Sequence, residues 1–340
     1  MRRILIFTLC LALLLSGCSF GQPQKKKYSA TFLTLFDTVT TVVGFSESEE
    51  AFTLQAQQIH DALQEYHRLF DIYNEYEGMN NLKTLNDAAG KGPVAVDGRI
   101  IALLKDCKRY YTLTGGRTNV ALGSVLALWH EARERGINDP ANASLPDEGE
   151  LRLAAVHCDP EAILIDETAS TVFFSDPEMR LDVGAVAKGW ALERVCESAP
   201  EGLLISVGGN IRATGPKDSQ GTPWVIGVQD PEDSSRNLHT LNVKLGSVVT
   251  SGDYQRRYWV GDTPYHHIID PETLYPGTLW RSVTVVCPDS GLADALSTAL
   301  FLLPLEEGLA LLRSCEAEAM WVDPEGICHY SPGFEAMIRT

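Results

Sequence analysis

An aspartate and a threonine lie four residues apart near the carboxyl end of the chain, in Ala293-Asp294-Ala295-Leu296-Ser297-Thr298-Ala299-Leu300. In a helix this spacing puts Asp294 and Thr298 on one face, among small and apolar neighbours. A carboxylate and a hydroxyl that converge from a mostly buried helix suit magnesium, whose remaining ligands would be water and phosphate oxygens. The alternative is a charge near a helix start and a threonine bonded back to its own helix.

Two adjacent histidines precede an acidic turn in Tyr265-His266-His267-Ile268-Ile269-Asp270-Pro271. We predict a strand over residues 267–269, and neighbouring side chains of a strand point to opposite faces, so one ring at most faces a given cleft. A histidine with a pKa near neutrality can take a proton from a hydroxyl nucleophile. A purely structural histidine is the alternative.

Two further segments have the composition of anion-binding turns. One runs from an apolar strand into Gly208-Gly209-Asn210, where missing side chains let backbone amides approach a phosphate, although paired glycines are also typical of a plain hairpin. The other, residues 181–189, leads from a short strand through small residues into a helix with Lys188 in its first turns, a seat for pyrophosphate. A surface lysine, with Asp182 as a simple helix cap, is the alternative there.

The hydrophobic pattern predicts a scaffold of mixed type for these segments. Helical patterns occupy residues 49–70, 99–113, 120–135, 148–156, 186–197 and 292–302. Patterns typical of strands occupy residues 38–45, 203–207, 224–228, 241–245, 267–269, 282–286, 319–322 and 327–330. Because strands and helices do not alternate regularly, we predict an α+β architecture rather than a doubly wound sheet.

The first 17 residues have the composition of an export signal, with basic Arg2 and Arg3 before an apolar run at residues 4–15. That run is shorter than the ~20 residues that a membrane-spanning helix needs. Leu15-Ser16-Gly17-Cys18 is similar to the lipobox of bacterial lipoproteins. We therefore predict that Cys18 is lipidated, that residues 18–30 form a polar tether, and that the protein is anchored to a bacterial membrane outside the cytoplasm. A plain cleaved signal is the alternative.

The charge balance is strongly acidic, with 45 Asp and Glu against 28 Lys and Arg and a formal net charge of −17. This argues against nucleic acid as a partner and requires a local field of opposite sign wherever an anionic substrate binds. The cysteines beyond Cys18 are irregularly spaced and contain no Cys-x-x-Cys motif, so zinc and iron–sulfur sites are not indicated. Some of them pair, or all are buried free thiols.

In their order along the chain, these segments resemble the ApbE family of FAD:protein FMN transferases. The resemblance also rests on Gly116-Arg117-Thr118-Asn119-Val120 and Thr250-Ser251-Gly252-Asp253-Tyr254, and it covers roughly residues 34–322. It implies that residues 31–340 form one transferase domain, with two α+β subdomains around a central cleft for FAD and magnesium.

The resemblance also implies roles for individual residues. Magnesium would be held by Asp294, Thr298 and the backbone carbonyl of Ala185, and His267 would act as the base beside the catalytic Asp294. The implied FAD contacts are Tyr73, Arg117, Thr118, Asn119, Asp182, Lys188, Gly208, Gly209, Asn210, Ser251, Gly252 and His267. Two positions depart from the family pattern: Asn119 replaces its usual aspartate, and Leu274 replaces a turn glycine, which predicts an altered loop geometry.

The reaction that the resemblance implies attaches the FMN half of FAD through a phosphoester to a threonine and releases AMP. The acceptors would be flavoproteins with a Ser/Asp-Gly-Ala-Thr type motif, such as subunits of Rnf- or Nqr-like redox complexes or FMN-binding domains. Two other hypotheses use the same pocket. One is a lipoprotein that binds and stores FAD without chemistry, and the other is an FAD pyrophosphatase in which water replaces the threonine.

Overall fold

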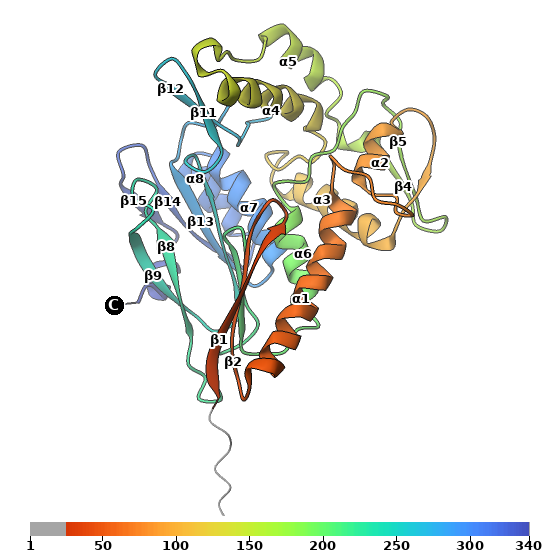
Figure 1. Ribbon diagram of the computed structural model, residues 1–340. Coiled ribbons are helices and arrows are strands. Elements are labelled where there is room, and N and C mark those ends of the chain that lie inside the picture. The colour runs from red at the N-terminus through yellow and green to blue at the C-terminus, as the bar shows by residue number, and fades with distance from the viewer. Residues whose placement is uncertain (1–24, 340) are drawn as a thin grey trace, which may run out of the picture.

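An eight-stranded sheet dominates the computed structural model, which describes residues 25–339 (Figure 1). Every neighbouring pair in it is antiparallel. The strand order is β1 (Lys26–Leu35), β2 (Thr38–Ser46), β6 (Leu203–Val207), β7 (Asn210–Ala213), β10 (Gly246–Gly252), β13 (Ser282–Cys287), β14 (Glu318–Val322) and β15 (Cys328–Tyr330).

Helices cover one face of this sheet and a separate hairpin covers the other. The helices are α1 (Glu49–Phe70), α6 (Ala187–Cys196), α7 (Ser290–Leu302) and α8 (Leu305–Leu312), and the hairpin is β8 (Trp224–Gln229) with β9 (Asn237–Val243). Alternation along β6 shows why: Ile205 and Val207 lie in the core under the helices, whereas Leu204 packs with the hairpin. The sheet therefore carries apolar side chains on both faces.

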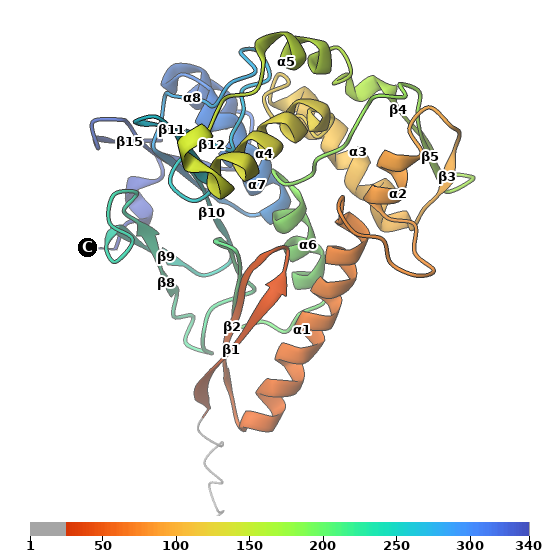
Figure 2. The ribbon, with the colours of Figure 1, turned by 45° about the horizontal axis from the view of Figure 1, so that its top comes forward.

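A smaller part of the molecule lies beyond one end of the sheet, as Figures 1 and 2 show. It contains a three-stranded sheet in the order β3 (Val94–Ala95), β5 (Thr171–Phe174) and β4 (Ile163–Asp166). Its other elements are α2 (Leu82–Asp87), α3 (Gly98–Leu113), α4 (Gly123–Asn138), α5 (Glu148–Ala155) and the hairpin of β11 (Arg257–Val260) with β12 (Thr263–His266). The predicted α+β class is confirmed.

Helix α1 has the bounds that the sequence predicted, Glu49–Phe70. Ser48 caps it by accepting a hydrogen bond from the Ala51 amide at 3.2 Å, and acidic Glu49 and Glu50 in the first turn suit the helix dipole. The helix ends where Asp71 adopts an extended backbone. Periodicity and capping agree here, so the sequence alone locates both ends.

The predicted tether over residues 18–30 is too long, because β1 already begins at Lys26 and pairs with β2 from there on. Tyr28 stacks on Phe52 of α1 with ring centroids 5.7 Å apart. This is an edge strand, and lysines such as Lys26 and Lys27 are typical of edges because they oppose pairing with other chains. Tyr28, Ala30 and Phe32 alternate with polar residues and pack on the core, so only the lysines at the start of the strand resemble a tether. Cys18 lies outside the described residues.

Three predicted elements near the site differ from the structure. The strand predicted at residues 267–269 is absent: β12 ends at His266, and Ile269 makes only an isolated bridge to Pro276. The helix predicted from residue 120 begins at Gly123, because Val120 and Leu122 instead bond to residues preceding α6. The strand expected at residue 181 is reduced to the bridge between Leu122 and Arg180.

In the described part of the chain no helix is long and apolar enough to cross a membrane. The six cysteines that the structure describes are all unpaired, which agrees with the interpretation as free thiols.

Candidate active site

Asp294 lies on α7 where this helix touches the first turn of α6. The contact requires glycine at position 189, since a Cβ there would lie 2.2 Å from the Ser290 carbonyl oxygen and 2.6 Å from the Asp294 Cβ. The Gly189 amide donates to Oδ2 of Asp294 at 2.9 Å. Val186, at the start of α6, offers no side-chain cap. The Asp294 carboxylate therefore satisfies an amide that would otherwise lack a partner.

The Asp294 carboxylate is short of compensating charge. Burial raises its pKa, against which Lys188, the Gly189 amide and the Asn210 side chain act. The Lys188 Nζ is 3.8 Å from Oδ2 of Asp294 and donates to the Gly184 carbonyl at 3.0 Å. The buried Nδ2 of Asn210 makes no hydrogen bond within the described residues. A buried carboxylate in this state fits a bound cation.

The other two predicted metal ligands lie in segments that adjoin Asp294. Thr298 is the one position between Ala293 and Leu300 that is not buried, so solvent reaches this part of α7 there. Ala185 is half-buried in the turn before α6. No cluster of three histidine, cysteine or acidic side chains able to hold a metal occurs among residues 25–339. One carboxylate, one hydroxyl and one carbonyl completed by substrate oxygens fit magnesium.

The turn before α6 is ordered by Asp182. Its Oδ1 accepts from the Gly184 amide at 2.8 Å, and its own amide donates to the Val120 carbonyl at 2.9 Å. Asp182 thus caps this turn rather than the helix, which begins at Ala187. The Asp182 carboxylate therefore orders the turn in which Ala185 lies.

Gly208 and Gly209 form a two-residue hairpin that joins β6 to β7, with φ of +57° and +92°. The interpretation as a hairpin is correct. A Cβ at Gly208 would lie 2.5 Å from the Thr38 hydroxyl, so the turn packs closely on β2. Gly209 is exposed with open space around it. The turn places Asn210 near enough to Asp294 to act against the rise of its pKa, although the Asn210 Nδ2 makes no hydrogen bond within the described residues.

Ser251 and Gly252 end β10 beside α7. The Oγ atoms of Ser251 and Ser297 are 2.8 Å apart, and the Ser297 hydroxyl donates to the Asp294 carbonyl at 2.8 Å. A Cβ at Gly252 would lie 2.4 Å from the Tyr254 ring, which covers this position. These residues support α7 and one wall of the site.

A basic cluster surrounds His267, which directly follows β12. Solvent reaches the His267 side chain, yet the surrounding protein lowers its pKa to about 3, an effect to which the charges of Arg256, Lys188 and Arg133 add. Arg133 and Arg256 could not be assigned to this site from the sequence, because no spacing links residues of α4 and of the segment before β11 to residue 267.

The lowered pKa of His267 predicts the protonation state of the free protein. We expect NMR titration of the His267 imidazole to give a midpoint below 6.5, and Arg256→Gln to raise it. Since the unfolded chain binds this proton more readily, His267 lowers the free energy of unfolding as the pH falls below about 6.5. His267→Gln should therefore weaken that pH dependence in denaturant titrations. A midpoint at or above 6.5 would contradict the prediction.

Tyr73 lies just beyond α1 with its ring exposed and tilted against His130 at a centroid distance of 5.6 Å. The buried Asp71 carboxylate holds this loop by accepting from the amides of Tyr73 and Asn74 and from the Tyr76 hydroxyl. An exposed aromatic ring on a fixed loop offers a surface for stacking. Its assignment as a flavin contact stays a prediction.

Arg117, Thr118 and Asn119 lie in a loop whose side chains are occupied by protein partners. Arg117 pairs with Asp270 at 2.8 Å and with Glu272 at 2.9 Å. Thr118 is 2% exposed and donates to the Ala295 carbonyl at 2.7 Å. These contacts fasten the loop to α7 and to the segment after His267, and they give no support for a direct FAD contact by Thr118.

Asn119 uses both ends of its amide. Its Oδ1 accepts from the Ala121 amide at 2.9 Å, and its Nδ2 donates to the Cys158 carbonyl at 2.9 Å. An aspartate could make only the first of these bonds. Arg117 and Asn119 also line a cavity of about 230 Å³.

Leu274 keeps the left-handed turn that a glycine would permit, with φ of +65°, so the predicted change of loop geometry is not found. Its side chain is 9% exposed in a core with Trp129, whose Nε1 donates to the Leu274 carbonyl at 2.9 Å. Burial offsets a backbone strain of roughly 1–2 kcal/mol.

Substitutions at Leu274 separate these two effects. Leu274→Ala should lower the free energy of unfolding by about 2–3 kcal/mol, because it removes apolar burial and keeps the strain. Leu274→Gly should be more stable than Leu274→Ala by about 0.5–1 kcal/mol, the reverse of the usual order. Urea denaturation measures both values, and an alanine variant at least as stable as the glycine variant would refute the strain.

Known proteins resemble this chain over most of its length. The model of the ApbE family matches residues 36–321. A Treponema pallidum protein named FAD:protein FMN transferase is 31% identical, over 95% of this chain and 92% of its own. A Klebsiella pneumoniae protein of the same name is 32% identical, over 73% of this chain and 78% of its own. The crystal structure of an ApbE protein from Thermotoga maritima superimposes with a TM-score of 0.82 at 29% identity, over 93% of this chain and 100% of that one.

Proposed function

This chain belongs to the ApbE family, and we propose that it splits FAD and transfers the FMN half to a threonine of an acceptor protein. The chain is a transferase, and its relatives are named for flavin transfer. The observation that carries the finer proposal is the buried Asp294 carboxylate, whose one cation, Lys188 at 3.8 Å, also belongs to the basic cluster that acts on His267. Although the protein is acidic overall, Lys188, Arg133 and Arg256 provide positive charge at this site, which suits a dianionic pyrophosphate.

Asp294, Thr298 and the Ala185 carbonyl would hold magnesium against the pyrophosphate. When bound, this ion supplies neutralisation of phosphate charge, which favours departure of the AMP group. Lys188 and Arg256 add positive charge on the same side, because both act electrostatically on His267. These residues orient the phosphorus on the FMN side towards the incoming hydroxyl.

The lowered pKa of His267 favours the neutral imidazole in the free protein, which can accept a proton on its ring. In the proposed step the acceptor hydroxyl loses its proton to His267 while its oxygen bonds to the FMN-side phosphorus. The bond from that phosphorus to the bridging oxygen breaks, and AMP leaves with the electron pair. The products are a phosphoester-linked flavoprotein and AMP, so that atoms and charge balance.

We propose acceptors with a Ser/Asp-Gly-Ala-Thr type motif, and a lipid anchor at Cys18 on the extracytoplasmic side of the membrane. The order of β1 and α1 supports such an arrangement. β1 starts beside the first residues of α1, and its far end meets His67 near the last turn, where the Phe36 amide donates to the ring at 3.3 Å. The 22 residues of α1 span roughly 33 Å, so an anchored protein would present the site well away from its tether.

The test is to incubate the purified protein with FAD, magnesium and an acceptor domain, and to follow flavin on the denatured acceptor together with AMP release. The proposal predicts one AMP for each flavin attached. Tight FAD binding without AMP would favour the storage protein. Free FMN and AMP at a rate that ignores the acceptor would favour the pyrophosphatase.

A further inference from the structure

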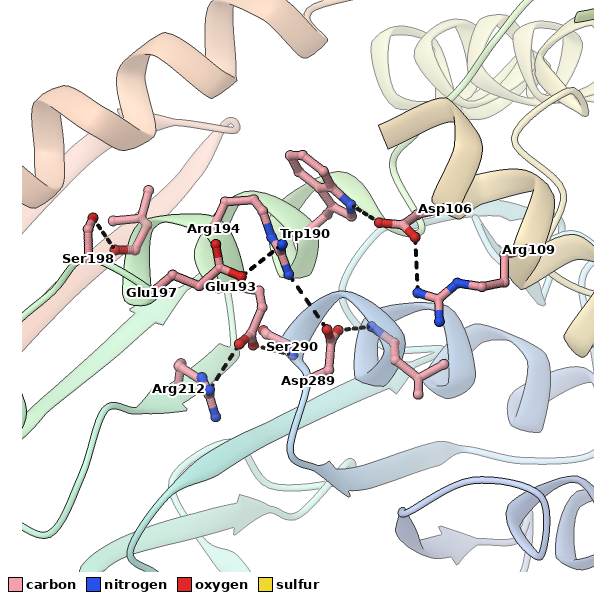
Figure 3. Close-up of polar contacts among 12 residues, drawn as sticks. Asp106, Arg109, Trp190, Glu193, Arg194, Glu197, Ser198, Arg212, Asp289 and Ser290 are labelled. Carbon is pink, nitrogen blue, oxygen red and sulfur yellow. Dashed lines mark hydrogen bonds and ion pairs between the residues drawn. The ribbon is translucent and has the colours of Figure 1, made fainter. Parts of the chain in front are cut away.

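A second buried carboxylate, Glu193, joins α6 to the other end of the α6–α7 contact (Figure 3). The residue is 8% exposed. One oxygen of Glu193 lies 2.9 Å from Nη2 of Arg212 on β7, and the other accepts from the Ser290 amide at 2.7 Å. Burial raises the pKa of Glu193, whereas the Ser290 amide and Arg212 act in the opposite direction.

The two helices therefore cap each other. Ser290 is the first residue of α7, and its amide binds a carboxylate from α6; Gly189 lies in the first turn of α6, and its amide binds a carboxylate from α7. Asp294 and Glu193 thus form reciprocal bonds across one close contact. A slide of either helix along the other would break both bonds, so each bond fixes the register that the other needs.

The Arg212 guanidinium has no second acidic partner in the described part of the chain. Its Nε and Nη1 are buried without hydrogen-bond partners there, and Glu193 is its one ion-pair partner among residues 25–339. Removing the charge of Glu193 would leave a buried guanidinium uncompensated. That guanidinium lies on β7, the strand that also carries Asn210 beside Asp294.

Helix α7 has a second cap at its start that does not involve Glu193. Asp289 caps it from within the chain by accepting from the Leu292 amide at 2.7 Å. Loss of Glu193 should therefore leave α7 folded but allow it to shift relative to α6. This separates a positioning effect from unfolding.

We propose that Glu193 is a positioning residue for Asp294: by holding the start of α7 against α6, it keeps Asp294 and Thr298 aligned with the turn at Ala185. This rests on the proposed function, in which these three residues hold magnesium. The consequence is that magnesium should bind more weakly when Glu193 is neutralised, although Glu193 touches neither metal nor substrate.

The experiment titrates magnesium into the full protein with FAD, using flavin fluorescence for binding and flavin transfer for rate. Glu193→Gln should raise the magnesium concentration at half-saturation at least tenfold, with a smaller change in kcat at saturating magnesium. The double variant Glu193→Gln/Arg212→Gln keeps an acceptor for the Ser290 amide and removes the unpaired cation. It should restore half-saturation to within threefold of the unmodified protein.

The matched control is Ile226→Ala, in the hairpin layer on the opposite face of the sheet. It should lower the melting temperature without changing magnesium half-saturation. Hydrogen exchange of the Gly189 amide gives a readout that needs no activity, and Glu193→Gln should accelerate it whereas Ile226→Ala should not. If Glu193→Gln matches the control in both readouts, the positioning role is wrong. If the unmodified protein shows no magnesium-dependent FAD binding, the proposed function fails, and the exchange measurement still decides the role of Glu193.

Discussion

Asp294→Asn is expected to lower the rate of flavin transfer by roughly 10³-fold, the several kcal/mol that a lost metal ligand costs in the transition state. The same substitution should leave the free energy of unfolding unchanged or higher. The asparagine side chain retains an oxygen for the Gly189 amide and removes a buried charge whose nearest cation is 3.8 Å away. Activity and stability therefore move in opposite directions, which is typical of a residue held in place for function.

The measurement combines single-turnover flavin transfer with urea denaturation in the absence of magnesium. Asp166→Asn is a matched control, because Asp166 is an exposed carboxylate in a turn of the small sheet and accepts from the amides of Thr168 and Ala169. It should leave transfer unchanged. Full activity of Asp294→Asn would exclude Asp294 from the site, and a large loss of stability would show that its charge is structural.

His267→Gln is expected to lower the transfer rate by about 10²–10⁴-fold, the usual contribution of a positioned general base. The KM for FAD should change little, because the base acts on the acceptor hydroxyl. The pH profile carries independent information: the pKa of His267 is lowered in the free protein, so loss of rate from protonation should begin below pH 6.5. Bound phosphate would raise that pKa by favouring the protonated ring.

The neighbouring histidine is the natural control. One ring nitrogen of His266 donates to the Gly277 carbonyl at 2.8 Å, and the other accepts from the Ile268 amide at 3.2 Å. Both nitrogens are therefore used within the protein. His266→Gln should lower stability by about 1 kcal/mol and leave the rate for each folded molecule nearly unchanged. If His266→Gln lost more activity than His267→Gln, the assignment of the base would have to be exchanged.

The parts of the fold that the sequence predicts best are those in which local signals agree. Helix α1 combines an apolar stripe with a serine cap and acidic first-turn residues, and its bounds follow from these alone. Strand β1 was not predicted at all, although Tyr28, Ala30 and Phe32 alternate with polar residues, because the lysines before them have the composition of a polar tether. The bounds near residues 120 and 267 failed because tertiary bonds of the backbone replaced the local preference there.

In the candidate site, too, some residues can be predicted from local sequence signals and others cannot. Asp294 and Thr298 can be paired from their spacing on one helix, and Lys188 from its place in a helix start. Arg133 and Arg256 reach His267 through the packing of α4 against the β11–β12 hairpin, which no local pattern records. Glu193 looks like an ordinary surface position of an amphipathic helix until α7 is placed against it.

A crystal structure of the protein with FAD and magnesium tests the central claim most directly. We expect the pyrophosphate between Lys188 and His267, with the metal bound by Asp294, Thr298 and the Ala185 carbonyl. The molecule offers a clear alternative, a cavity of about 480 Å³ that Cys287 of β13 and Leu312 of α8 help to line. FAD bound in that cavity, or a metal that does not touch Asp294, would contradict the account.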